Sequence, residues 1–400
     1  MAAILLRNSL LLFVISFLAT GASSNPISSP RAKYVDHSLG KRAINAVKTT
    51  YTDGNVIDWV PIESQGIIAS PPPPRAPCTN ATAPVSELQV PGAEVGPPGT
   101  VPIPRVNLDY LTASTSLKEP PQVKPKGPNK RQYGGRHWYV NSGQSVNNFG
   151  GSAIYSLFNA YVQSPGDFSL IQTAIVKNSV PIPGNPSSTG PQTLEAGWIN
   201  YPNQVSQPHL FTYFTTCGYT CSGDNVGGWN RDQAGWVQTD SDYFPGTIFV
   251  PDSTDGGSQT EMEISYYLFQ GNWWLYVINK YIGYYPASLF SANEANAAAT
   301  LSNGGDYLAY YGEIYQEQDA MTTTDMGSGE FASLGYGRSA YMHNMEYYDT
   351  TTPNANAFGY TSGFGDDDSS RYSHSTVASG GDWGNYIYLG GPGAGGVVNG

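Results

Sequence analysis

The fold of this chain is decided by the stretch GNWWLYVINKYI at residues 271–282, and YLAYYGEIY at residues 307–315 repeats its character. Both are short alternating runs rich in aromatic and β-branched residues, and Gly, Pro and Asn separate such runs throughout residues 132–400. Periodic helix patterns are nearly absent, although the alanines of residues 291–301 favour one or two helical turns. This pattern predicts an all-β sandwich or barrel, with a long Gly-, Ser- and Asp-rich loop over residues 354–382.

The N-terminal end of the chain is typical of a secretory signal. Arg7 precedes a run at residues 10–18 that is apolar except for Ser16, and small residues follow it. That run is too short to span a membrane. We therefore assign residues 1–24 to a signal peptide and expect a secreted, extracellular protein.

Residues 25–131 are dense in proline, which disfavours helices and central strands. They end at the dibasic pair Lys130-Arg131, a target of Kex-type processing enzymes that suggests a fungal source. This organisation predicts a pro-segment at 25–131 and a catalytic domain at 132–400. A flexible linker with incidental basic residues is the alternative.

The balance of acidic and basic residues also changes after residue 131. Residues 132–400 hold 6 of the 19 basic residues and 23 of the 31 acidic ones. An acidic surface repels itself at neutral pH, and the repulsion fades as carboxylates become protonated, which suggests adaptation to low pH. The same charge would repel phosphates, so nucleic acid is not expected as a partner.

The three cysteines fit an oxidising compartment. Cys217 and Cys221 predict a small disulfide loop. A zinc site with His209 is the alternative, but the spacing matches no common zinc pattern and a fourth ligand is not evident. Cys78 remains as an odd thiol, and Asn80 beside it begins an N-glycosylation sequon. We expect no metal and no organic cofactor.

Glu195 and Glu313 are the candidate reactive groups. Each stands among aromatic, small and apolar neighbours, where a strand would bury it. A buried carboxylate is costly unless it is paired, protonated or used, and two that converge can share one proton in acid–base chemistry. The sequence lacks the Gly-x-Ser-x-Gly elbow, the His-Glu-x-x-His helix, phosphate and dinucleotide loops and the pepsin-type Asp-Thr-Gly. Chemistry in this chain must therefore rest on carboxylates.

Several blocks around these glutamates resemble the neprosin-type glutamic peptidases. They occur in the family's order at residues 194–198, 209–214, 271–275, 283–290, 311–315, 326–329, 335–341 and 388–393. The resemblance implies an antiparallel β-sandwich of two packed sheets, jelly-roll or concanavalin-like. It also implies a secreted zymogen, monomeric and held inactive by its own pro-segment. Its activity would be that of a prolyl endopeptidase working on proline-containing proteins or peptides at acidic pH, with Glu195 and Glu313 matching the family's catalytic dyad.

Such hydrolysis needs no covalent intermediate. One ionised glutamate takes a proton from a water held between the carboxyls, and the other, protonated, hydrogen-bonds the scissile carbonyl. We expect substrate contacts from Trp198, Tyr213 and Tyr311. Because Trp198 lies three residues from Glu195, a bend or bulge would be needed to place both on one face of a strand. Core packing is the alternative for this tryptophan.

Two other readings remain open. A secreted β-sandwich glycoside hydrolase would use two carboxyls, and Glu261 and Glu263 share one strand face. Tyr266, however, occupies the third acidic position of the Glu-x-Asp-x-x-Glu pattern found in some glucanases, which removes the expected acid/base. A non-catalytic carbohydrate-binding or cell-surface module is the second, and it leaves the dibasic site unexplained.

Overall fold

The computed structural model describes residues 34–35, 46–52, 55–74, 95–107, 135–248, 250–349 and 364–400. Several sequence predictions fall outside these ranges: the signal peptide, Cys78, Asn80 and the Lys130-Arg131 site. Within the described residues no helix is long and apolar enough to cross a membrane. All helical segments in these ranges are short 3-10 turns, and strands build the rest of the regular structure.

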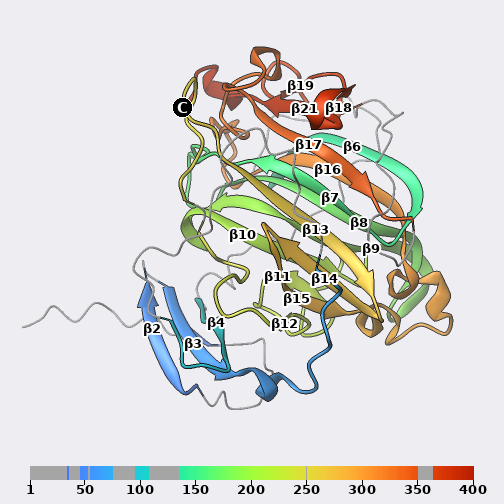
Figure 1. Ribbon diagram of the computed structural model, residues 1–400. Helices are drawn as coiled ribbons and strands as arrows, with labels where there is room; N and C mark the ends of the chain where they lie inside the picture. Colours follow the sequence, from blue (N-terminus) through green and yellow to red (C-terminus); the bar gives the residue numbers. More distant parts are fainter. Residues whose placement is uncertain are drawn as a thin grey trace, which may run out of the picture. The chain divides into compact units, whose positions relative to one another are not determined.

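Two large antiparallel sheets form the fold, which confirms the predicted all-β class (Figure 1). The first, here called the seven-stranded sheet, has the order β11 (Gly227–Trp229), β10 (Val205–Thr215), β9 (Asn185–Tyr201), β8 (Phe168–Ile182), β16 (Gly305–Gln316), β6 (Arg136–Asn148) and β18 (Gly365–Asp366). The second, the nine-stranded sheet, has the order β12 (Val237–Gln238), β15 (Lys280–Pro286), β14 (Asn272–Val277), β13 (Glu261–Phe269), β7 (Gly150–Ser156), β17 (Ala340–Tyr347), β21 (Asn385–Gly390) and β19 (Ser373–His374), with β20 (Ala378–Ser379) also pairing with β21.

The main core lies between these sheets and follows from the period-two pattern of the strands. On β8, Ile171 and Ile175 enter this core, and on β13 Met262 and Ile264 do the same. Successive side chains of a strand alternate, so Gln172 and Ala174 of β8 and Glu263 of β13 point to the opposite faces. On the other face of the seven-stranded sheet, aromatic and apolar residues form two further clusters, which include Leu170, Tyr213 and Tyr311.

Two local predictions need adjustment. The helical turns expected at 291–301 occur as 3-10 turns at Ala287–Ser291, Ala297–Ala299 and Leu301–Asn303. The expected long loop at 354–382 contains, in its described part, β18, β19 and β20, each only two residues long. Backbone pairing at the sheet edges forms these short strands, and composition alone does not reveal such pairing.

The proline-rich N-terminal region contains a small sheet that the sequence did not suggest. β2 (Lys48–Thr52), β3 (Asn55–Pro61) and β4 (Thr100–Pro104) pair in that order. Prolines 102 and 104 lie on β4, an edge strand, where a missing N–H does not interrupt a ladder. The central strand β3 has proline only as its last residue, so it can pair on both sides.

Candidate active site

Glu195 and Glu313 lie on β9 and β16, the two strands that flank β8 (Figure 1). In register, Glu195 pairs with Ala174 of β8 and Glu313 pairs with Leu170. Both partners belong to the clusters on the face turned away from the main core. Two carboxyls separated by 118 positions in the sequence therefore share one face of one sheet.

The carboxyl of Glu195 is held by three hydroxyl groups. Thr193 donates to Oε1 at 2.9 Å, Tyr311 donates to Oε2 at 2.7 Å, and Tyr219 donates to Oε1. Burial raises the pKa of Glu195 to about 7, the Tyr219 and Tyr311 hydrogen bonds lower it, and the charge of Glu313 raises it. The carboxyl is fully buried, so its neutral form is favoured in acid.

Glu313 has a different set of neighbours. Its Oε1 contacts Nδ1 of His137, a residue of β6 that is also buried. The His137 ring packs against Tyr315 and Phe168, with ring centroids 4.9 and 5.9 Å away. Burial raises the pKa of Tyr139 well above its ordinary value, and the charge of Glu313 and a hydrogen bond to it raise it further. The phenol of Tyr139 therefore stays a protonated donor.

The two carboxyls influence one another. The charge of Glu313 contributes to the raised pKa of Glu195, and the charges of both glutamates raise the pKa of Tyr139 and of Tyr311. Such interactions are stronger between buried groups than between exposed ones, because the protein interior screens charge less than water does. The charge on Glu313 therefore influences the protonation of Glu195.

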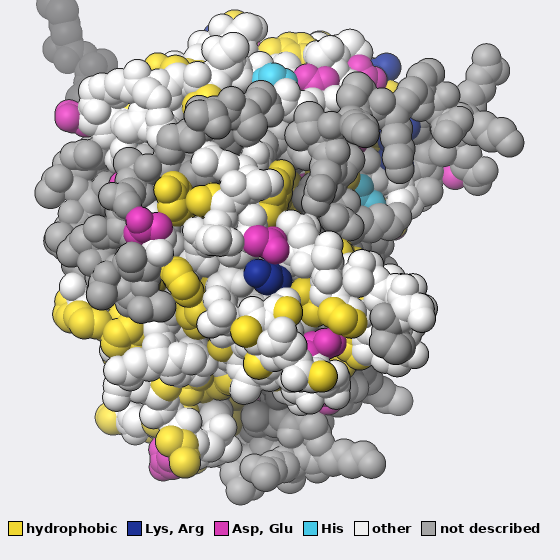
Figure 2. Space-filling view, turned by 90° about the vertical axis from the view of Figure 1, so that its right-hand side faces the viewer, with side chains coloured by type: hydrophobic (Ala, Val, Ile, Leu, Met, Phe, Trp, Pro, Cys, Tyr) yellow, Lys and Arg dark blue, Asp and Glu magenta, His cyan; other side chains and the backbone are white. Residues whose placement is uncertain are grey.

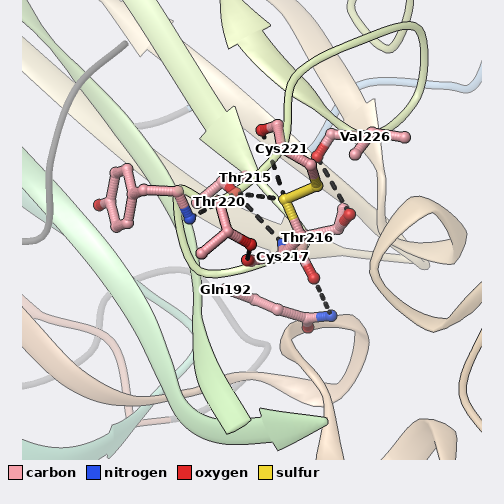
Figure 3. The surroundings of a disulfide bond; sticks show 8 residues. Gln192, Thr215, Thr216, Cys217, Thr220, Cys221 and Val226 are labelled. Atoms are coloured by element: carbon pink, nitrogen blue, oxygen red, sulfur yellow. Dashed lines mark hydrogen bonds between the residues drawn. A yellow bond between two sulfur atoms is a disulfide. The ribbon is translucent and has the colours of Figure 1, made fainter. Parts of the chain in front are cut away.

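Tyr219 was not anticipated from the sequence, and it lies in the loop that the disulfide closes. The structure confirms the predicted Cys217–Cys221 bond (Figure 3). Thr215 Oγ1 accepts from the backbone N–H groups of Cys217 and Tyr219 at 3.2 and 3.3 Å. The closed loop thus places a phenol over Glu195, and the proximity of Tyr219 to the cysteines was the only signal available.

The predicted substrate contacts fall on two different faces. Tyr213 pairs with Glu195 across β10 and β9, and its ring stacks on Tyr219 with centroids 5.9 Å apart. Tyr311 contacts Glu195 directly. Trp198 instead points into the main core, where its Nε1 donates to the carbonyl of Ser156 at 2.9 Å. No bulge interrupts β9 between Glu195 and Trp198, so the alternation of the strand separates them.

The rival groups lie elsewhere. Glu261 and Glu263 sit on β13 of the nine-stranded sheet, on the face opposite to Met262 and the main core. His209, the possible zinc ligand, is buried, and its ring nitrogens contact Gln207 O and Gln204 Oε1 at 2.8 and 3.0 Å. Burial lowers the pKa of His209 to about 4. Among the described residues, no group of three or more His, Cys, Asp or Glu is placed to hold a metal ion.

Comparison with known proteins adds two findings. Among solved structures, two crystal structures of Scytalido-glutamic peptidase, one with a peptide-based transition state analog and one with a transition state analog inhibitor, are similar over 64% of this chain and 97% of theirs. Their identities are 7% and 8%, with TM-scores of 0.29 and 0.28, too low to support an argument. The model of the neprosin family matches residues 165–392, more than half of the chain and a span that contains Glu195, Glu313 and the strands between them. The chain therefore belongs to the neprosin family.

Proposed function

We propose that the processed chain is a secreted glutamic endopeptidase that hydrolyses peptide bonds at acidic pH, with Glu195 and Glu313 as its catalytic dyad. Membership of the neprosin family supports a peptidase. The observation that carries the dyad is the convergence of two buried, electrostatically coupled carboxyls on one sheet face. Phenols and an imidazole surround them, and these groups can hold protons in place.

The surroundings of the two carboxyls suggest different roles. Glu195, with a pKa raised to about 7, carries the proton in acid and hydrogen-bonds the scissile carbonyl oxygen. Glu313, whose Oε1 contacts Nδ1 of His137, is then the ionised member of the dyad and acts as the base. Glu313 takes a proton from water, and the hydroxyl attacks the carbonyl carbon while Glu195 transfers its proton to the oxygen.

Collapse of the tetrahedral intermediate completes the cycle. Glu313 gives the proton it has taken to the leaving nitrogen, and the carbon–nitrogen bond breaks. Glu195 takes its proton back from the oxygen as the carbonyl re-forms. The dyad thus returns to its singly protonated state, and no covalent bond to the enzyme is formed.

Cleavage after proline is proposed from the family resemblance. The aromatic cluster beside Glu195 supports it, because Tyr213 and Trp229 pack edge to face with centroids 5.2 Å apart, and flat rings stack well on proline. A set of peptides that differ only in the residue before the scissile bond tests this specificity at acidic pH. Equal cleavage after alanine and proline would remove proline from the proposal and leave the dyad in place.

The dyad itself is tested by Glu195→Gln in the processed protein. We expect turnover to fall by about 10³-fold or more, because the amide cannot deliver a proton. Glu263→Gln is the matched control, a buried glutamate of the nine-stranded sheet, and it should keep wild-type turnover. Wild-type turnover in a folded Glu195→Gln protein would show that the dyad is misassigned.

Inhibition by the predicted pro-segment is proposed as part of the same function. The described part of this segment packs on the predicted catalytic domain: Gln65 Nε2 donates to Gln238 O at 2.7 Å, and Gln65 Oε1 accepts from Gln238 N at 3.0 Å. Trp59 and Ile57 pack with Phe244. Both glutamates have no exposed surface in the full-length chain, so a substrate needs them uncovered.

A processing experiment tests this inhibition. The full-length protein with Lys130→Ala and Arg131→Ala should resist a Kex-type enzyme and stay inactive, whereas the wild-type chain becomes active after cleavage. Adding Gln65→Ala to the uncleavable protein should restore part of the activity, because it removes both hydrogen bonds to Gln238. Full activity of the uncleavable protein would exclude inhibition by this segment.

A further inference from the structure

Gln172 occupies the position between the two glutamates. It lies on β8, where it pairs with Gly197 of β9 on one side and Tyr311 of β16 on the other. The residues two positions away on β8 pair with Glu195 and Glu313 respectively. Gln172 is thus the diagonal neighbour of both carboxyls on the same face of the sheet, within reach of long side chains.

The side-chain amide of Gln172 is buried but makes no hydrogen bond to a described residue that would stabilise the fold. The side chain has no exposed surface, and neither its Oε1 nor its Nε2 has a hydrogen-bond partner among the described residues. A buried amide without partners costs free energy, and an apolar side chain of the same size would pack there at lower cost. Another buried glutamine of this sheet, Gln192, donates to Phe290 O at 2.9 Å and accepts from Leu301 N at 2.9 Å.

The neighbours of Gln172 keep its position open toward the carboxyls. Gly197, its partner on β9, brings no side chain to this face, and a Cβ there would come within 2.8 Å of Gln172 Cβ and 2.0 Å of Ile171 O. Tyr311, its partner on β16, directs its hydroxyl to Glu195. No bulge interrupts β8 between its pairings at residues 169 and 177, so the placement of Gln172 is fixed by a regular ladder.

We propose that Gln172 is a further catalytic residue, whose Nε2 donates a hydrogen bond to the scissile carbonyl oxygen as negative charge develops on it. This inference rests on the proposed function, because a carbonyl acted on by both Glu195 and Glu313 must lie between them, over Gln172. A donor already in place, in a site without competing partners, stabilises the transition state more than the ground state. The proton that moves still comes from Glu195; Gln172 contributes only the hydrogen bond.

Gln172→Met tests the proposal, because methionine keeps the volume and removes the donor. In the processed enzyme we expect kcat to fall by about 10²–10³-fold while KM stays within about two-fold, as for the loss of one oxyanion donor. The same variant should be at least as resistant to urea as the wild type, because an unpartnered amide has been removed. Gln192→Met is the matched control, with wild-type kcat and lower stability, since it breaks the hydrogen bonds of this amide to Phe290, Leu301 and Thr216.

Gln172→Glu gives an independent readout of proximity to the dyad. A third carboxyl between the two raises their apparent pKa values, so the pH profile of any remaining activity should move to higher pH. Wild-type kcat in Gln172→Met, or a loss of stability that accounts for its lower activity, would overturn the proposal. If Gln172→Met stays fully active while Glu195→Gln is inactive, the inference fails alone; if Glu195→Gln is itself active, the proposed function fails.

Discussion

Two sheets of this molecule each bury a glutamate beside a tyrosine and a histidine. On the seven-stranded sheet, Glu195 and Glu313 contact Tyr311 and His137 respectively. On the nine-stranded sheet, Tyr341 donates to Glu261 at 2.7 Å, and His343 Nε2 lies 3.3 Å from the same carboxyl. Residue types alone therefore do not distinguish the proposed catalytic site from the glutamates of the nine-stranded sheet.

The arrangement of the carboxyls does distinguish them. Glu195 and Glu313 come from strands on either side of β8, and the charge of one acts on the other. Glu261 and Glu263 follow one another on a single strand, and Ser152 lies 3.5 Å from Glu263. A water molecule and a substrate carbonyl need acid and base on opposite sides, which two neighbours on one strand do not provide. The convergence of two carboxyls from different strands is therefore a better indicator of function than the residue types around each carboxyl.

The sharpest way to break this comparison is to neutralise one glutamate in each sheet. We expect Glu313→Gln to lower kcat by about 10³-fold or more, because the base is lost. Glu261→Gln should keep kcat and lower the Tm by a few degrees, about 1 kcal/mol, through a weakened contact with Tyr341. Peptide hydrolysis and thermal melts of both variants provide the measurements. Equal losses of kcat would mean that both sheets contribute to the site.

The second prediction concerns the pH dependence of stability. The folded pKa of Glu195, about 7, lies above the value near 4.3 of an unfolded glutamate. Its contribution is therefore fully present below about pH 4.3 and is lost as pH rises through 7, on the order of 3 kcal/mol. Glu195→Gln should flatten that part of the urea-unfolding profile between pH 4 and 8. An unchanged slope would contradict the raised pKa.

Individual residues show how much of the site could be predicted from the sequence. The alternating pattern predicted the strands, and the apolar surroundings of Glu195 and Glu313 marked both carboxyls before their strands were known to be neighbours. His137 was not readable, because its contact with Glu313 depends on the pairing of β6 with β16. Strand alternation already argued against Trp198, and the structure places it in the main core.

Gln172 is a second residue whose surroundings could not be predicted from the sequence. A glutamine between Leu170 and Ala174 on one face of a strand is a local signal of function or of a hydrogen-bonded core. Only the register of three strands shows that its neighbours are the two glutamates. Sequence identifies the unusual side chain, and long-range pairing identifies what it faces.

The third prediction removes the disulfide. Replacing Cys217 and Cys221 together by serine opens a loop of five residues, which should cost about 2 kcal/mol of stability. We expect kcat to fall by about 10-fold as well, because Tyr219 is no longer held over Glu195. Tyr219→Phe in the wild-type background separates the two effects, since it keeps the loop closed. Normal kcat in the double serine variant would show that the loop positions Tyr219 without help.

The smallest effect is expected from Tyr311→Phe. The hydrogen bond from Tyr311 lowers the pKa of Glu195, so its removal should raise that pKa. The alkaline limb of the rate profile then moves to higher pH, because Glu195 stays protonated longer. Tyr341→Phe, the equivalent change at Glu261, should leave the profile in place. A shift of the acid limb to higher pH, with the alkaline limb in place, would mean that Glu195 acts as the ionised partner.

The disulfide loop also has a consequence for how the protein is produced. The strands of the sandwich need no oxidation to pair, whereas the Cys217–Cys221 bond does. Material made in the bacterial cytosol should therefore show a normal far-ultraviolet spectrum and yet hydrolyse peptides slowly. A thiol titration shows whether the two cysteines of each preparation are reduced. Oxidation with a glutathione mixture should then restore activity to reduced wild-type enzyme, but not to a variant with an inactivating substitution.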